Sequence, residues 1–144
     1  MKKKLILLFV LVCAVLLSLC GCSDFAFNPV GRWEARKEIL YADGTVQYSG
    51  DLAEGQYGVL PALVFKKTGT GYIDSGTKTT LEFTYEYTDD KVTIERAQTG
   101  TDQTVSVEYE VKDNGSSLVA VIEEYDGEEN GKTVHYRRDI VFNR

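Results

Sequence analysis

Cysteine is missing from most of this sequence. The chain has three cysteines, and all of them, Cys13, Cys20 and Cys22, lie within the first 22 residues. The rest of the chain therefore has no thiol for a disulfide framework, a cysteine-ligated zinc site or a nucleophilic cysteine. We expect the folded part to be stabilised by a hydrophobic core and not by covalent cross-links.

Clusters of basic residues are also absent beyond the first few positions. Lys2, Lys3 and Lys4 account for three of the 16 Lys and Arg residues, whereas all 22 Asp and Glu residues follow Cys22. Residues 22–144 thus have 13 basic residues against 22 acidic ones, a formal charge of about −9. This charge repels phosphate backbones, and no basic stripe or Arg cluster offsets it. We expect no nucleic-acid partner.

Residues that commonly carry catalysis are few. His135 is the only histidine, and it is in phase with Arg137 and Asp139, away from the apolar positions. We therefore expect His135 on a solvated strand face, without a general-base role. The acidic segment 126–130 lacks the ligand spacing of a calcium loop, and no glycine-rich loop follows a strand and opens a helix. The sequence predicts no enzyme activity, no metal site and no cofactor.

The first 22 residues have the layout of an export signal. Three lysines precede an almost purely apolar run from Leu5 to Leu19, which is shorter than the roughly 20 residues of a membrane-spanning helix. The run ends in Leu19-Cys20-Gly21-Cys22, which resembles a bacterial lipobox. The resemblance implies cleavage before Cys22, a lipid on its thiol and attachment to the extracytoplasmic face of the membrane in a bacterial cell envelope. The alternative is an ordinary secretory signal that ends near a cysteine.

Cleavage would leave 123 of the 144 residues. This length suits one domain that buries on the order of two-thirds of its unfolded surface. We expect residues 1–21 to form the signal peptide, residues 22–29 a lipid-anchored tether and residues 30–144 a single folded domain.

Alternation of apolar and polar residues dominates the predicted domain. It is clearest where Leu81, Phe83, Tyr85 and Tyr87 alternate with polar side chains. Similar runs, mostly separated by two to five turn residues, predict further strands at 31–41, 45–49, 62–67, 72–74, 92–95, 105–112, 118–125 and 134–142.

The same alternation predicts which residues share a face. In the first run, Ile39 and Tyr41 are in phase with Trp33 and Ala35, which predicts one common side. The run at 118–125 is apolar in both phases at its start, so its facing stays open. The connection from Gly50 to Leu60 is the longest and serves either as a lid or as a surface crossover.

Eight or nine strands without a convincing amphipathic helix predict an all-β domain. The short connections favour an antiparallel up-and-down meander, in which consecutive strands pair. Such a meander leaves two exposed edges unless it closes. We therefore predict closure into a small β-barrel.

The residues also resemble a known family. Gly31-x-Trp33 at the head of the first strand, a β meander and an Arg on the last strand are similar to the lipocalin and lipocalin-like superfamily, and the segment 63–71 is similar to bacterial lipocalin-like lipoproteins. The resemblance implies a lipocalin-like barrel in which an Arg lies across Trp33 at the closed end. Arg138 is the candidate for this barrel-closing pair, and Arg137 and Arg144 are alternatives.

Whether the barrel interior is filled or hollow distinguishes two possible functions, protein interaction and ligand binding. An eight-stranded barrel is just wide enough to be filled by side chains or to hold one small ligand. The candidate ligand-lining residues are aromatic, namely Phe65, Phe83, Tyr85, Tyr109 and Tyr136. We expect a non-enzymatic lipoprotein that binds a small, partly apolar ligand in its barrel. The alternative is a filled barrel acting as a protein-interaction or inhibitor module at the cell envelope.

Overall fold

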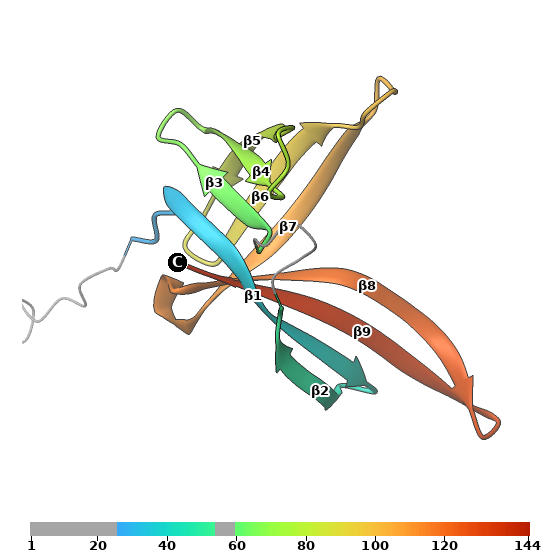
Figure 1. Ribbon diagram of the computed structural model, residues 1–144. Helices are drawn as coiled ribbons and strands as arrows, with labels where there is room; N and C mark the ends of the chain where they lie inside the picture. Colours follow the sequence, from blue (N-terminus) through green and yellow to red (C-terminus); the bar gives the residue numbers. More distant parts are fainter. Residues whose placement is uncertain (1–25, 54–59) are drawn as a thin grey trace, which may run out of the picture.

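Antiparallel strands make up most of the residues that the computed structural model describes, which are 26–53 and 60–144 (Figure 1). These ranges contain one 3-10 turn, η1 (Asp113–Gly115). They also contain nine strands: β1 (Gly31–Ala42), β2 (Thr45–Asp51), β3 (Ala62–Phe65), β4 (Thr70–Asp74), β5 (Leu81–Tyr87), β6 (Lys91–Ala97), β7 (Thr104–Lys112), β8 (Ser117–Glu129) and β9 (Lys132–Asn143).

Part of the predicted organisation falls outside these ranges. The predicted signal peptide, Cys22 and the central residues of the predicted lid, 54–59, are not among the described residues. Within the described ranges, no helix has the length and apolar character needed to span a membrane.

Eight of the strands close into a barrel. They follow the order β1-β3-β4-β5-β6-β7-β8-β9, and β9 pairs with β1 to complete the circle. All of these pairings are antiparallel. The predicted all-β class and the closed antiparallel barrel are confirmed, and the architecture is compatible with a lipocalin-like fold.

β2 lies outside the barrel because the strands differ greatly in length. β1, β8 and β9 contain 12, 13 and 12 residues, whereas β3 contains four. The pairing of β3 with β1 covers only Gly31–Glu34 of β1. The pairing of β7 with β8 covers only Ser117–Val119 of β8. The rest of each long strand projects from the barrel, and β2 pairs with the projecting part of β1.

We name this projecting four-stranded sheet the extension. It consists of β2 with residues 37–42 of β1, 121–129 of β8 and 132–141 of β9, in the order β2-β1-β9-β8. In Figure 1 it reaches away from the end of the barrel at which the described chain begins. Its inner face continues the barrel interior, and its outer face continues the barrel surface.

A bulge in β1 places Ile39 and Tyr41 on a different face from the one predicted. The register between β1 and β9 slips between Ala35 and Lys37. Because side chains alternate with a period of two, the slip moves the following residues to the other side. Ile39 and Tyr41 therefore lie on the outer face, opposite Trp33, and the predicted common side is wrong.

A second bulge settles the facing of β8. Leu118 and Ala120 are buried in the barrel core. The register with β9 then slips between Val121 and Glu123. Glu123 and Tyr125 consequently lie on the inner face, in line with Ala120, although the sequence separation from Ala120 is odd.

The hydrophobic core lies inside the barrel and begins before β1. Phe27 is 4% exposed and Pro29 is fully buried, so residues 27–29 belong to the folded domain. The predicted boundary at residue 30 is therefore too late. The buried cluster consists of Phe27, Trp33, Leu63, Phe65, Phe83, Tyr85, Val92, Ile94, Tyr109, Leu118 and Ala120.

Candidate functional site

The barrel interior contains four of the five aromatic residues predicted to line a ligand pocket. The ring of Phe65 contacts Tyr85 at 4.9 Å and Phe83 at 5.3 Å between centroids, in edge-on arrangements. Tyr109 packs edge-on against Phe142 at 5.7 Å, and burial raises the pKa of its hydroxyl to about 12. All four predicted residues are at most 9% exposed. Such contacts are typical of a packed aromatic core.

The fifth aromatic residue lies elsewhere. Tyr136 is on the extension, where its ring stacks on Tyr125 at 5.2 Å. Its hydroxyl donates a hydrogen bond to Glu129 at 2.6 Å, which raises the pKa of Tyr136 to about 12. The ring also crosses Gly127, where a Cβ would lie 2.9 Å from it. The prediction that Tyr136 lines the barrel interior is therefore wrong.

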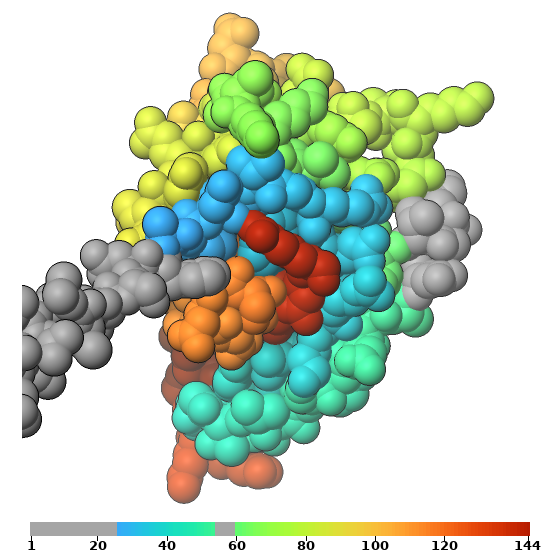
Figure 2. All heavy atoms as spheres, turned by 90° about the vertical axis from the view of Figure 1, so that its left-hand side faces the viewer, coloured from blue at the N-terminus to red at the C-terminus, as the bar shows by residue number. Residues whose placement is uncertain are grey.

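Trp33 and Arg144 close one end of the barrel. Trp33 is fully buried, and its indole N–H donates to the carbonyl of Pro29 at 2.7 Å. The guanidinium carbon of Arg144 lies 4.5 Å from the centroid of the Trp33 ring, and the guanidinium also donates to the carbonyl of Asn28. Figure 2 views this end and shows the red C-terminal residues lying against the blue start of β1.

Arg138, the first candidate for this pair, has a different role. It lies on the inner face of the extension, 3.4 Å from Glu38 and 3.3 Å from Glu123. Pairing of Trp33 with Arg138 is thus wrong, and the alternative partner Arg144 is confirmed. The alternation of residues in β9 correctly predicted that Arg138 lies on the same face as Phe142. It did not predict that the barrel ends before Arg138.

Phe27 fills the same end of the barrel. Its ring lies 6.1 Å from both Trp33 and Tyr87. Its main-chain N–H donates to the Asp89 carboxylate at 3.1 Å. The segment leading into β1 is therefore part of the closure and not a free tether.

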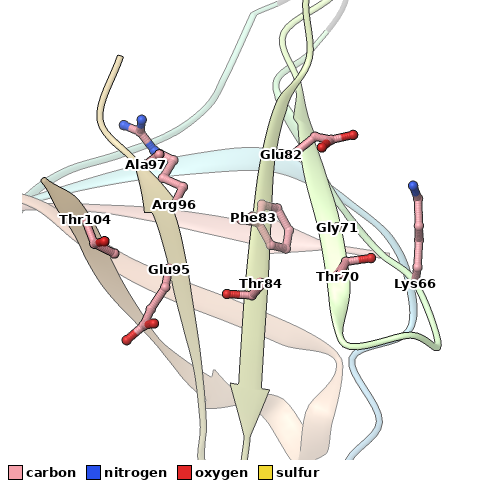
Figure 3. A pocket seen from close by; sticks show the side chains of 10 residues that line it. All are labelled: Lys66, Thr70, Gly71, Glu82, Phe83, Thr84, Glu95, Arg96, Ala97 and Thr104. Atoms are coloured by element: carbon pink, nitrogen blue, oxygen red, sulfur yellow. The ribbon is translucent and has the colours of Figure 1, made fainter. Parts of the chain in front are cut away.

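A groove of about 420 Å³ crosses the barrel surface over β4, β5 and β6 (Figure 3). The groove opens because β5 pairs with β6 only over Thr84–Tyr87. The preceding residues of β5, 81–83, are separated from β6. The two basic residues of the groove, Lys66 and Arg96, lie at opposite sides in Figure 3. A small-molecule site usually has a few polar groups that converge on one point, and this groove has dispersed ones.

The extension carries most of the exposed large apolar side chains. Of the seven most exposed in the described ranges, five belong to it, and two, Leu81 and Tyr87, belong to the barrel. Exposed apolar residues that gather on one element mark an interaction surface more often than scattered ones do. Here Tyr48 and Tyr125 lie on the inner face, and Val46 and Val121 lie on the outer face. The five are Val46, Tyr48, Val121, Ile122 and Tyr125.

Two clusters of charged residues lie on the outer face of the extension. The ring nitrogens of His135 are 2.8 Å from Asp126 and 2.9 Å from Glu124. These hydrogen bonds, chiefly the one to Asp126, raise the pKa of His135. Beside it, Arg137 donates two hydrogen bonds, at 2.7 and 2.8 Å, to the Asp139 carboxylate, which is 2% exposed.

Neither cluster is arranged to hold a metal ion. Among residues 26–53 and 60–144, no group of three or more His, Cys, Asp or Glu side chains is placed to hold a metal ion. His135 lies on the predicted solvated face, and carboxylates contact both of its ring nitrogens.

Comparison with protein-family models, with curated proteins and with solved structures gives no significant match for this chain. The candidate site therefore rests on the geometry of the extension. Sequence reasoning missed this surface, although the lengths of the predicted first and last strands exceeded those of their neighbours.

Proposed function

We propose that this chain is a lipid-anchored, non-enzymatic protein of the bacterial cell envelope, and that its extension binds another protein. The position of the apolar side chains carries the proposal. The interior aromatic residues pack against one another, whereas the exposed large apolar side chains gather on the extension. A β-barrel is compatible with holding a small ligand, but rings in direct contact favour a filled barrel.

The anchor in this proposal is Cys22, supported by the resemblance to a lipobox. Phe27 is already buried in the barrel, so the five steps from Cys22 to Phe27 span at most about 18 Å. The barrel end closed by Trp33 would thus lie near the lipid surface. The extension lies on the far side of the molecule from this end (Figure 1), so it would face away from the membrane.

Substitution of the anchor tests the localisation. We expect Cys22→Ser to move the protein from the membrane fraction to the soluble extracytoplasmic fraction, because the acyl chains would be lost. The measurement is fractionation followed by immunodetection. Unchanged membrane association of the variant would refute the anchor.

Site-specific photo-cross-linking in cells tests the binding surface. We expect a photoreactive residue at Tyr48 or Tyr125, both on the inner face of the extension, to yield a discrete protein adduct. The matched control is Glu86, an exposed residue of β5 on the barrel. Adducts from Glu86 and from neither extension position would contradict the proposal. A small molecule that co-purifies in native mass spectrometry would instead favour ligand binding.

A further inference from the structure

We infer that residues 121–129 of β8, which we name the acidic edge, bind an extended basic segment of a partner protein as an additional β-strand. This inference rests on the proposed function, because it specifies the partner chemistry for the same extension.

The acidic edge has one side open to pairing. β9 occupies the other side along the whole length of the edge. β7 pairs with β8 only as far as Val119, and Figure 1 shows β7 turning away from β8 beyond that point. Among the described residues, no group outside β9 forms a hydrogen bond with the main chain of 121–129. Such an edge is a template for an added strand.

The charge of the edge selects the partner. Residues 121–129 contain five acidic residues and neither Lys nor Arg. Glu124, Asp126 and Glu128 follow one another on the outer face, and the side chains of Glu124 and Asp126 are 54% and 67% exposed. A strand with Lys or Arg at every second position would place its bases beside these carboxylates. Two acidic edges would repel each other, which disfavours pairing with a second copy.

The inner face of the extension indicates which side chains of the added strand should alternate with its basic residues. Here Tyr125 stacks on Tyr136 beside Gly127, which has no side chain. A hollow of about 230 Å³ next to these rings lies over β1, β9 and β8 and is lined by Leu40, Tyr41, Glu123, Tyr125, Tyr136, Arg137 and Arg138. An apolar side chain of the added strand would lie directly beside Tyr125 and Gly127 on this face. The expected segment therefore alternates basic with apolar residues.

Protection against aggregation explains part of this composition, since charges commonly guard exposed edges. It does not explain Ile122 and Tyr125, which are 49% and 53% exposed within the same edge. The other outer strand of the sheet, β2, differs because Asp51 is its only charged residue. β2 therefore serves as the reference edge in the experiment.

The test uses the full-length, lipidated chain in detergent and a nine-residue peptide that alternates lysine with valine. We expect binding that weakens with salt and protects amides of 121–129, but not of 45–51, from hydrogen exchange. Glu128→Lys should weaken binding about threefold to tenfold. Glu86→Lys, which changes the net charge equally on the barrel, should leave binding unchanged.

Two N-methylated peptides test whether the peptide adds as a strand. One is methylated at the odd residues and the other at the even residues, so only one of them loses the N–H groups that would face β8. We expect one to lose binding and the other to retain it. Equal binding of both, or protection of β2 instead of the acidic edge, would overturn the inference.

The two proposals fail separately. Absence of peptide binding, with cross-links from Tyr48 or Tyr125 intact, would refute the acidic edge and leave the interaction surface standing. Absence of cross-links from both positions, with peptide binding at 121–129 intact, would refute the proposed cellular function alone.

Discussion

Gly71 is required by a neighbouring carbonyl group and a neighbouring ring, and not by its own backbone conformation. A Cβ on Gly71 would lie 2.3 Å from the carbonyl oxygen of Val64 and 2.4 Å from the nearest ring atom of Phe83. Phe83 is 4% exposed and packs against Phe65 and Tyr85. The missing side chain thus lets a core ring lie directly over the main chain of the adjacent strand.

Alanine at this position should therefore destabilise the barrel. We expect Gly71→Ala to lower the free energy of unfolding by about 1–3 kcal/mol, because a packed core resists an added methyl group. Gly127→Ala is the matched control, since its Cβ would meet the half-buried ring of Tyr136, which lies on the extension and outside the core. We expect it to cost less than about 1 kcal/mol. Urea denaturation measures both, and equal losses would contradict the difference in packing.

At this scale, residue pattern predicted what faces inward but not where the barrel stops. Alternation placed Phe65, Phe83, Tyr85 and Tyr109 correctly in the interior. The alternation failed to place Tyr136. The same side of β9 faces the barrel interior at Phe142 and the inner face of the extension at Tyr136, so the pattern does not show where the barrel ends. The requirement for Gly71 was also beyond prediction, since it depends on its pairing with Phe83, and register is not visible in a single strand.

The β8–β9 hairpin is the longest element pair and forms the tip of the extension. Asn130 and Gly131 join the strands with φ angles of 52° and 75°, as in the tight turns that suit a twisted hairpin. Beyond the turn, His135 lies directly opposite Asp126 and also contacts Glu124. The imidazole of His135 therefore links two carboxylates of the neighbouring strand.

This arrangement should make the stability of the protein depend on pH. The two carboxylates, Asp126 first, raise the folded-state pKa of His135 above its ordinary value of 6.5. The stabilising contribution is therefore fully present below about pH 6.5 and is lost as the pH rises through the raised pKa. At about pH 5.5, we expect the unsubstituted chain to have a higher free energy of unfolding than His135→Gln. At about pH 8.5, this difference should disappear. Urea denaturation at the two pH values measures it.

A titration of the His135 ring by NMR provides the independent check. Its midpoint should lie above about 6.5 and fall in Asp126→Asn. A midpoint at or below the ordinary value would contradict the proposed role of the carboxylates.

The elements themselves were largely predictable, because turn residues separate clear alternating runs. Asp43-Gly44 and Asn130-Gly131 mark tight turns, and the need to remove exposed edges predicted closure. The bulges in β1 and β8 were not predictable, because no residue in either run marks them. The exclusion of β2 from the barrel also escaped prediction, since it depends on direct pairing of β3 with β1.

The whole molecule combines a barrel that contains the core with an extension that has almost none. Every member of the buried hydrophobic cluster lies in the barrel or immediately before β1. Among the described residues of the extension, Asp139 is the only buried one. The extension therefore depends on strand pairing, stacked tyrosines and ion pairs. Apolar burial contributes most to stability, so the two parts should differ in their resistance to opening.

Native-state hydrogen exchange should reveal this difference. We expect amides of β6 to exchange only through global unfolding, whereas amides of 123–129 and 132–137 open locally and exchange at least about tenfold faster. Leu118→Ala separates the two routes, because a cavity at this fully buried residue should lower global stability by about 2–5 kcal/mol. Exchange in β6 should then accelerate, while exchange in the extension should scarcely change. Acceleration of both regions together would mean that barrel and extension unfold as one unit, and the acidic edge could not open independently of the core.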